Sequence, residues 1–423
     1  MNDQAVWQAE PAVVAVQRRT VRLLASAQIV GGIGIGAGAS LGALLAESVT
    51  SSESMAGLAR TAATLGAAVV AIPLATLAGR RGRRTSLGLG WAIAAVGGLA
   101  LVVSAALDSV VILVLGMLMF GSGTATNLQS RYAATDVALP ARRAGTLSLV
   151  VWSTTIGAVL GPNLSGPGAA VAEWLNLPEL AGAFVISAVV LALAALLMSF
   201  LRPDPLLLAR RRTPAVVHPP GTSPPKRNVA AALSAVRSSP VARFALVTVV
   251  LGQTVMAAVM TMTPVHMTHH GASLELVGMT ISVHVLGMYA FSPLVGRLAD
   301  VWGRVQTIVL GQLLFLAAAV LAGLSNSSTV LVTAGLLLLG LGWSCSLVAG
   351  SALLVESVPE QIRTSVQGTS DMLMNVFAAI AAGVSGPLQT AWGFGGLNLV
   401  AAMLTVPVFV LVLGMRRWVV RVT

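Results

Sequence analysis

Residues 296–304 read GRLADVWGR, and a related stretch, ATLAGRRGRR, occupies residues 75–84. Each stretch follows a long apolar run and combines small residues with glycine and arginine. The likeness continues downstream, because DVALPARR at 136–143 corresponds to ESVPEQIR at 356–363. Gly82 and Gly303 are 221 positions apart, and Asp136 and Glu356 are 220 apart. Duplicated loops at one offset predict two halves of similar structure, related by pseudo-symmetry.

The composition is that of a membrane protein. Hydrophobic residues make up 56% of the 423 residues and charged residues only 9%, with a mean hydropathy of +0.88. The apolar runs are long enough to cross a hydrocarbon core of about 30 Å. The predicted fold is an all-α membrane protein with twelve transmembrane helices in two pseudo-symmetric six-helix bundles. The predicted spans are 23–46, 57–79, 85–106, 110–133, 144–169, 179–201, 241–266, 274–297, 304–324, 328–354, 366–390 and 395–415.

The basic residues predict the orientation of these spans. With the N-terminus placed inside, all 25 Lys and Arg residues except Arg60 fall on the inner side, as the positive-inside rule requires. We therefore expect a multi-pass protein of the cytoplasmic (inner) membrane with both termini cytoplasmic. Residues 1–22 do not have the pattern of a cleavable signal peptide, so the first span is expected to be permanent. The net charge of +11 follows from this topology, and no nucleic-acid partner is expected.

The middle of the chain separates the two halves. Residues 202–240 are proline-rich and basic and lack apolar periodicity, which is typical of a linker. The predicted domains are an N-terminal six-helix bundle at 1–201, a cytoplasmic linker at 202–240 and a C-terminal six-helix bundle at 241–423. His218 is expected to be a solvated residue of the linker.

Soft metal ligands are concentrated just after the linker. Four of the five histidines lie between residues 256 and 288, together with six of the fifteen methionines. Met256 and Met260 are four residues apart, as are His284 and Met288, so each pair shares a helix face. Thioether and imidazole groups suit Cu(I). At 1.5 Å per residue, Met256 and His284 would lie at similar depth, roughly 15 Å below the outer surface.

Two interpretations of these residues stay open. Methionine commonly fills gaps in apolar packing, whereas an ionisable group such as His284 at membrane depth is costly and is usually functional. His266, His269 and His270 either capture metal at the outer mouth or serve as polar caps. The acidic residues of the outer loops would draw cations inward.

Asp371 is the best candidate for proton coupling, since a carboxylate at low dielectric can take up a proton reversibly. The alternative is that it pairs with Arg363. The glycines of the first span do not match a nucleotide-binding loop, and no hydrolase or protease motif is present, so neither an enzyme nor a cofactor is expected.

The repeated G-x-L-A-D-x-x-G-R loops, the six-plus-six topology and the long linker resemble the major facilitator superfamily over essentially the whole chain. Gly157, Gly161, Pro162 and Gly166 also resemble the superfamily's antiporter motif, whose direct physical reading is small-residue helix packing with a proline kink. The resemblance implies alternating access with a substrate held between the halves.

The loop signatures imply gating residues, which are Gly82, Arg83, Asp300, Gly303 and Arg304. The first repeat departs from the family pattern, because Gly79 stands where aspartate is preferred. An aspartate–arginine ion pair that fastens the gate would therefore depend mainly on Asp300.

A narrower likeness concerns the methionine and histidine pattern and the NLQSRYAATD run at 127–136, which resemble the copper-uptake branch typified by CcoA. This resemblance implies copper import with Met256, Met260, His284 and Met288 as ligands. The branch is also similar to riboflavin transporters, and its copper-carrying members have several functional cysteines where this chain has only Cys345.

The sequence thus predicts a secondary transporter, most simply a monomer, that imports copper ion as its cargo. The alternative cargo is an organic solute, such as a riboflavin-like metabolite or a drug, with proton-coupled efflux as one form. A membrane sensor or scaffold without transport would require a soluble domain or a disrupted gate, and the sequence has neither feature.

Overall fold

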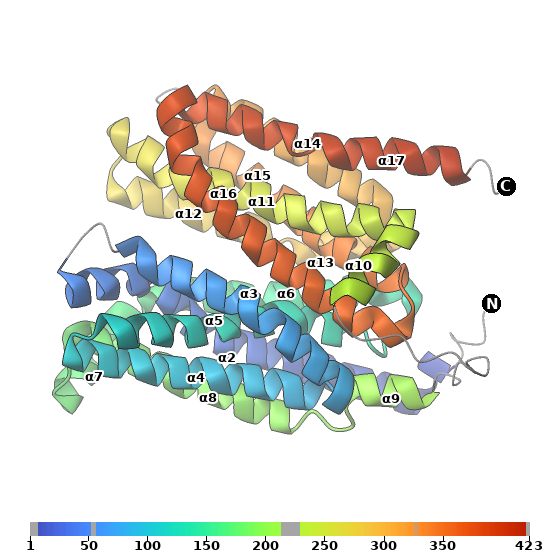
Figure 1. The fold of residues 1–423 in the computed structure, drawn as a ribbon, viewed down its shortest axis with the longest axis horizontal. Coiled ribbons are helices and arrows are strands. Elements are labelled where there is room, and N and C mark those ends of the chain that lie inside the picture. The colour runs from blue at the N-terminus through green and yellow to red at the C-terminus, as the bar shows by residue number, and fades with distance from the viewer. Residues whose placement is uncertain (1–6, 52–55, 213–228, 326–327, 420–423) are drawn as a thin grey trace. The chain divides into compact units, whose positions relative to one another are not determined.

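The computed structural model describes residues 7–51, 56–212, 229–325 and 328–419, and these residues form helices and connecting turns without a strand. His218 lies outside the described residues. Figure 1 shows the helices in chain order. The helices are α2 (Pro11–Thr50), α3 (Ala56–Arg81), α4 (Arg83–Leu107), α5 (Val110–Ala133), α6 (Arg143–Leu160), α7 (Ser165–Leu175), α8 (Glu179–Ser199), α9 (Pro205–Arg212), α10 (Val229–Ser238), α11 (Pro240–His269), α12 (Leu274–Tyr289), α13 (Ser292–Val301), α14 (Arg304–Gly323), α15 (Thr329–Glu356), α16 (Glu360–Met403) and α17 (Val406–Val419). Short 3-10 turns occur at Pro140–Arg142 and Gly161–Leu164.

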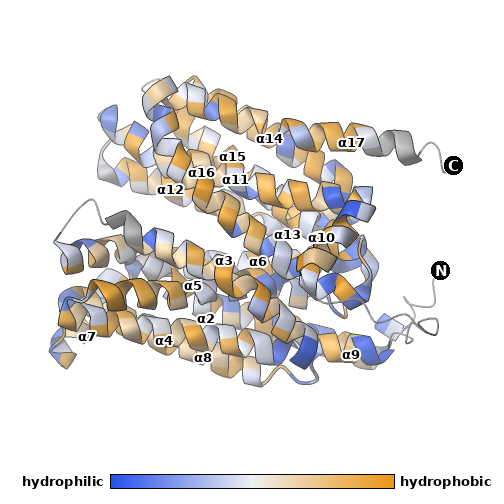
Figure 2. Cartoon of the chain, viewed as in Figure 1, coloured by the Kyte–Doolittle hydropathy of each residue, from blue (hydrophilic) through white to orange (hydrophobic). Residues whose placement is uncertain are grey.

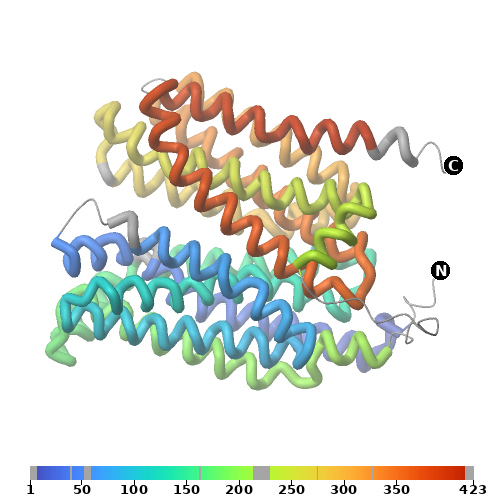
Figure 3. The backbone as a smooth tube through the Cα atoms, in the orientation of Figure 1, coloured from blue at the N-terminus to red at the C-terminus, as the bar shows by residue number. Residues whose placement is uncertain are grey.

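The predicted all-helical membrane fold is confirmed. Within the described residues, eleven helical stretches are long and apolar enough to span a membrane. One of them, Glu360–Gly414, has 55 residues and at 1.5 Å per residue would be roughly 80 Å long, enough for two crossings. It is broken at Gly393, where φ is 70°, and Figure 3 shows the chain turning back after this region.

Apolar residues dominate the helices, and polar residues gather on α9 and at helix ends (Figure 2). Several helices begin at a serine whose side chain caps the first turn. Ser109, Ser239, Ser273 and Ser328 each accept a hydrogen bond from the backbone N–H three residues later. Such a cap satisfies one of the N–H groups that the first helical turn leaves without a partner.

The two repeated loops form the same kind of turn. Gly82 between α3 and α4 has φ of 89°, and Gly303 between α13 and α14 has φ of 122°. A side chain is disfavoured at these angles, which explains why both repeats carry glycine at this point. In each case a new helix begins with the arginine that follows, Arg83 or Arg304.

The chain divides into two compact units. Unit 1 contains Met1–Pro140, Ser153–Ala231 and the short segment Gln367–Met372 of α16, and unit 2 contains Ala141–Trp152, Ala232–Val366 and Leu373–Thr423. The predicted linker at 202–240 contains the helices α9 and α10 on either side of residues that are not described. The predicted domain limits at 201 and 241 stay predictions.

Glycine allows close helix packing in unit 1. A Cβ placed on Gly32 would lie 3.2 Å from the Cα of Gly157, and one on Gly36 would lie 2.9 Å from the Cα of Gly161. The GxxxG spacing at 157–161 therefore matches a pair of glycines on α2, and the two backbones approach closely. This geometry agrees with the packing interpretation of the motif.

Candidate transport site and gate

Unit 1 contains a buried ion pair between α4 and the turn after α5. Arg83 donates from Nε to Asp136 Oδ2 at 2.7 Å and from Nη2 to Asp136 Oδ1 at 3.1 Å. Arg83 Nη2 also donates to Gln367 Oε1 at 2.7 Å. All three side chains are buried. The two-pronged geometry fixes the guanidinium in position and offsets part of the cost of burying both charges.

A second buried ion pair joins α5 to the same short segment of α16. Arg131 Nη2 donates to Asp371 Oδ1 at 2.7 Å and to the Tyr132 hydroxyl at 3.1 Å. The side chains of Arg131 and Asp371 are 1% and 0% exposed, and the guanidinium lies 4.4 Å from the centre of the Tyr132 ring. Asp371 thus forms an ion pair with Arg131, a partner that the sequence analysis did not name.

The repeats explain the first of these pairs. Arg83 and Asp136 correspond by position to Arg304 and Glu356, and the second two also form an ion pair, with Arg304 Nη2 3.0 Å from Glu356 Oε1. The side chains of Arg83 and Asp136 are each 1% exposed, while those of Arg304 and Glu356 are 11% and 25% exposed. The same loop signature therefore produces a buried ion pair in unit 1 and a more accessible ion pair in unit 2.

Asp300 holds the start of α6 in unit 2. Its Oδ1 accepts from the Ala144 N–H at 3.1 Å and its Oδ2 from the Gly145 N–H at 2.7 Å. Oδ1 is also 2.7 Å from Arg304 Nη1. A carboxylate at a helix N-terminus satisfies free N–H groups and interacts favourably with the helix dipole. Asp300 thus joins α13, α14 and α6 at a single point.

Different residues occupy the corresponding place in unit 1, where Gly79 replaces the aspartate. Arg210 of α9 donates from Nη1 to the Gly79 carbonyl at 2.5 Å. Asp204, next to α9, accepts from the Arg84 backbone N–H at 2.8 Å. Helix α9 and the residue just before it therefore supply a cation and an anion to the first repeated loop.

His284 lies in the interface between α12 and α15. Its Nδ1 is 2.8 Å from the Leu336 carbonyl oxygen, and because a carbonyl only accepts, Nδ1 carries the proton. In the neutral ring Nε2 then carries the lone pair, and this atom is buried without a hydrogen-bond partner among the described residues. Met288, one turn further along α12, is 7% exposed.

Met256 and Met260 lie on another helix and share their face with Gln253. On an ideal helix Met256 is about 60° and Met260 about 20° around the axis from Gln253. Gln253 Oε1 accepts from Trp343 Nε1 of α15 at 2.6 Å, and Trp343 packs edge-on against Tyr289 with ring centres 5.4 Å apart. We name Gln253, Tyr289 and Trp343 the amide–aromatic cluster.

Helix α15 is the neighbour that α11 and α12 have in common. It packs along both of them, while α11 and α12 contact each other only slightly. His284 and Met288 are buried, whereas Met256 and Met260 are half-buried. Among the described residues, no group of three or more His, Cys, Asp or Glu side chains is placed to hold a metal ion.

The histidines at the end of α11 form a small stack in unit 2. His266 is buried and stacks on Phe394 with ring centres 4.1 Å apart. The centre of the His270 ring lies 4.3 Å from that of the His266 ring. His270 Nδ1 is 2.8 Å from the His266 carbonyl, so this ring completes the end of the helix. His269 is exposed.

Sequence reasoning did not identify the amide–aromatic cluster. Its members lie in three separate apolar spans, and nothing in their spacing connects them. The scarcity of tyrosine was the one sequence feature that could have indicated the cluster, because the chain has only two tyrosines. Tyr132 lies beside the Arg131–Asp371 pair and Tyr289 lies in the cluster.

Comparison with known proteins gives one consistent result. The family profile described as Major Facilitator Superfamily matches residues 23–283 and 244–419. The "uncharacterized MFS-type transporter YddS" of Bacillus subtilis is 36% identical over 392 residues, which cover 92% of this chain and 88% of the relative. Riboflavin transporter RfnT of Brucella anthropi is 28% identical over 400 residues, 94% of each chain. The solved structure of the human organic anion transporter MFSD10 (TETRAN) superposes with a TM-score of 0.74 at 17% identity and covers 93% of this chain and 99% of its own.

Proposed function

This chain belongs to the major facilitator superfamily and is a multi-pass secondary transporter, and from that premise we propose that it carries a small organic solute across the cytoplasmic membrane. The family consists of transporters and not enzymes. We further propose that both termini are cytoplasmic and that the protein works as a monomer.

The observation that carries the proposal is the amide–aromatic cluster. The Gln253 amide nitrogen and the Tyr289 hydroxyl form no hydrogen bond with the described residues. Neither is among the atoms that are buried without a partner, so both keep some accessible surface. Gln253 and Trp343 lie near the middle of α11 and α15. Polar groups that are accessible at this depth belong beside a water-filled path rather than against lipid tails.

The surroundings of the cluster suit an organic molecule. Met256 and Met260 share the face of Gln253, so they would line the same path with a polarizable apolar surface. An apolar wall with a few hydrogen-bonding groups is the usual composition of a small-molecule site. The name of the relative, riboflavin transporter RfnT, supports an organic cargo, because riboflavin combines a flat aromatic ring with many hydrogen-bonding groups.

Uptake by cells or proteoliposomes with and without the protein tests the proposal, with radiolabelled riboflavin among a panel of aromatic solutes. Tyr289→Phe removes one hydroxyl and keeps the ring, so KM for the cargo should rise about tenfold, as expected for one lost hydrogen bond. Met262→Leu is the matched control, because Met262 lies near Gly386 on α16. The organic-solute proposal fails if no solute of the panel is taken up in a protein-dependent way. The assignment of the amide–aromatic cluster to the site fails if Tyr289→Phe leaves the transport of every carried solute unchanged.

Copper ion is the second candidate cargo, and His284 is the observation that favours it. A histidine that ligates a metal usually donates its other N–H to a carbonyl or carboxylate, and His284 has this arrangement with Nε2 left available. Met288 adds a thioether on the same face of α12. Met256 and Met260 would have to supply further ligands from α11.

Uptake of ⁶⁴Cu separates the two candidates. If copper is the cargo, His284→Ala and Met256→Leu should each abolish protein-dependent accumulation, although Met256→Leu preserves volume and apolarity. If the wild type accumulates no copper beyond cells that lack the protein, the copper candidate is excluded. If both variants accumulate copper as the wild type does, His284 and Met256 are not its ligands and their role is packing.

We also propose roles for the charged residues. Asp371 is the proposed proton-coupling carboxylate, exchanging its partner Arg131 for a proton during the cycle. Gly82, Arg83, Asp300, Gly303 and Arg304 are the proposed gate, since the geometry of the two repeated loops depends on them. His266, His269 and His270 would bind metal at the outer mouth only if copper is the cargo.

A further inference from the structure

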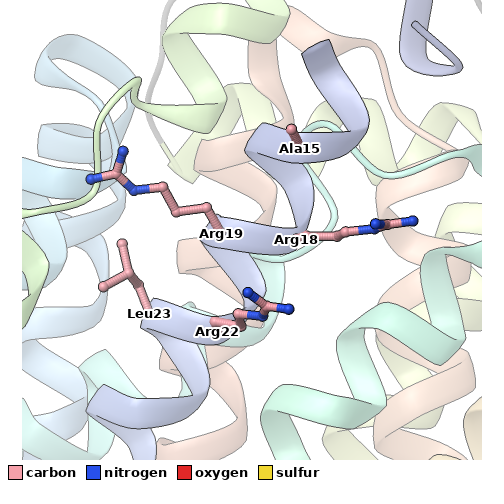
Figure 4. Close-up of a pocket in the computed structure, with 5 residues that line it drawn as sticks. All are labelled: Ala15, Arg18, Arg19, Arg22 and Leu23. Carbon is pink, nitrogen blue, oxygen red and sulfur yellow. The ribbon is translucent and has the colours of Figure 1, made fainter. Parts of the chain in front are cut away.

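A cavity of about 420 Å³ lies against the first turns of α2. Among the residues that the structure describes, its lining consists of Ala15, Arg18, Arg19, Arg22 and Leu23, none of which is acidic. Figure 4 shows the guanidinium groups of Arg18 and Arg22 on one side of α2 and that of Arg19 on the other. All three arginines are exposed, so an anion could reach them from solution or from the membrane surface.

The positive charge of this cavity is not neutralised within the described part of the chain. Arg18 and Arg22 form no hydrogen bond or ion pair there, and Arg19 donates only to the Phe200 carbonyl, at 3.3 Å. Glu10, which immediately precedes α2, has its Oε1 3.2 Å from Arg212 Nη1. Like charges four residues apart destabilise a helix, so Arg18 and Arg22 oppose each other unless an anion lies between them.

We propose that this cavity binds a phosphate group, most directly the headgroup phosphate of an anionic phospholipid. Guanidinium groups recognise phosphate with two parallel hydrogen bonds. The apolar run of α2 starts at Leu23, so the three arginines stand where the hydrocarbon meets the headgroups. The positive-inside rule places this end in the cytoplasmic leaflet, where anionic lipids attract basic segments.

The α2 backbone is held firmly enough to present the site. Gln17 Nε2 donates to the Ala134 carbonyl at 2.8 Å, which ties the same turn of α2 to the end of α5. Arg19 reaches the end of α8 through Phe200. A bound phosphate would therefore contact a turn of α2 that is tied to the ends of α5 and α8 in unit 1, without taking part in cargo binding.

Native mass spectrometry of the full-length protein in detergent tests the proposal, with phosphatidylglycerol or phosphatidylcholine added at equal concentration. The variant is Arg18→Gln with Arg22→Gln. The matched control is Arg80→Gln with Arg81→Gln, which removes the same charge from two other exposed arginines on the inner side. The first double variant should bind phosphatidylglycerol roughly 30-fold more weakly than the wild type, and the control should bind like the wild type.

A parallel titration with inorganic phosphate identifies the source of the group. Preference for phosphatidylglycerol that millimolar phosphate does not abolish supports a lipid site, and displacement by phosphate supports a site for a soluble phosphate compound. Equal retention of the two lipids without phosphate binding overturns the proposal. Equal loss of lipid in the two double variants also overturns it, because the binding would then reflect the general positive charge of the inner face.

Discussion

Replacing Asp371 by asparagine tests the buried polar centre of unit 1. The substitution keeps the size of the side chain and removes its charge, so Arg131 stays buried with its positive charge unbalanced. The Arg131–Asp371 distance of 2.7 Å and exposures of 1% and 0% place the pair in the class in which loss of one partner costs about 3–5 kcal/mol. A loss of this size should lower the Tm by on the order of 10 °C for a unit of some 200 residues.

A double-mutant cycle separates the ion pair from general disturbance of the core. Arg131→Met alone should be as damaging as Asp371→Asn, whereas the two together should recover most of the lost stability, because no uncompensated charge remains. Thermal unfolding of the four proteins in the same detergent provides the Tm values. Additive effects of the two substitutions would refute the inferred coupling.

The same variant also tests the proton-coupling proposal. Transport by wild-type protein in proteoliposomes should accelerate when a pH gradient is imposed, and transport by Asp371→Asn should not respond. A variant that keeps its fold and still responds to the gradient would show that another group couples the proton.

The remaining predictions concern the gate, the helix packing and the cargo. Asp300→Asn should slow turnover about tenfold with KM nearly unchanged, because it weakens the cap on α6 and removes an ion pair; a change confined to KM in proteoliposome kinetics would count against a gating role. Gly340→Ala should lower the Tm by several degrees, since the new Cβ would collide with the α12 backbone, whereas Gly278→Ala, which has open space, should be neutral in the same thermal scan. Met256→Leu should leave organic-solute transport intact and stop any copper accumulation, while Met262→Leu should change neither in paired uptake assays.

Much of the fold could be predicted because it depends on local properties. The length of each apolar run is set by the thickness of the hydrocarbon core, and the sidedness of the loops is set by their arginines. The extra crossing hidden in Glu360–Gly414 was also visible in the sequence, as an interruption near Gly393 between two apolar runs. Gly82 and Gly303 were singled out by the repeat of the loop, and the structure gives the reason for both, because each has a positive φ.

The candidate site was predicted less completely. Met256, Met260, His284 and Met288 were selected from their spacing, but spacing along a helix does not indicate the direction that each face takes. His284 turns to Leu336 on α15, while the face with the two methionines of α11 includes Gln253, whose partner is Trp343 on α15. In a soluble helix the polar face would have indicated the orientation, but here lipid and neighbouring helices are equally apolar, so the pattern carries little information.

The sequence by itself predicted that this chain spans a membrane with two similar halves, how its loops are oriented, and which glycines recur in them, because hydrophobic length, charge and short motifs act over a few residues. Only the tertiary structure decided which buried charged and polar side chains meet. Arg131 and Asp371 are 240 positions apart, and Arg83 and Gln367 are 284 apart, and no local property of either segment encodes its partner. A buried charge requires a counter-charge, but the helix that supplies it is chosen by the packing of the whole unit.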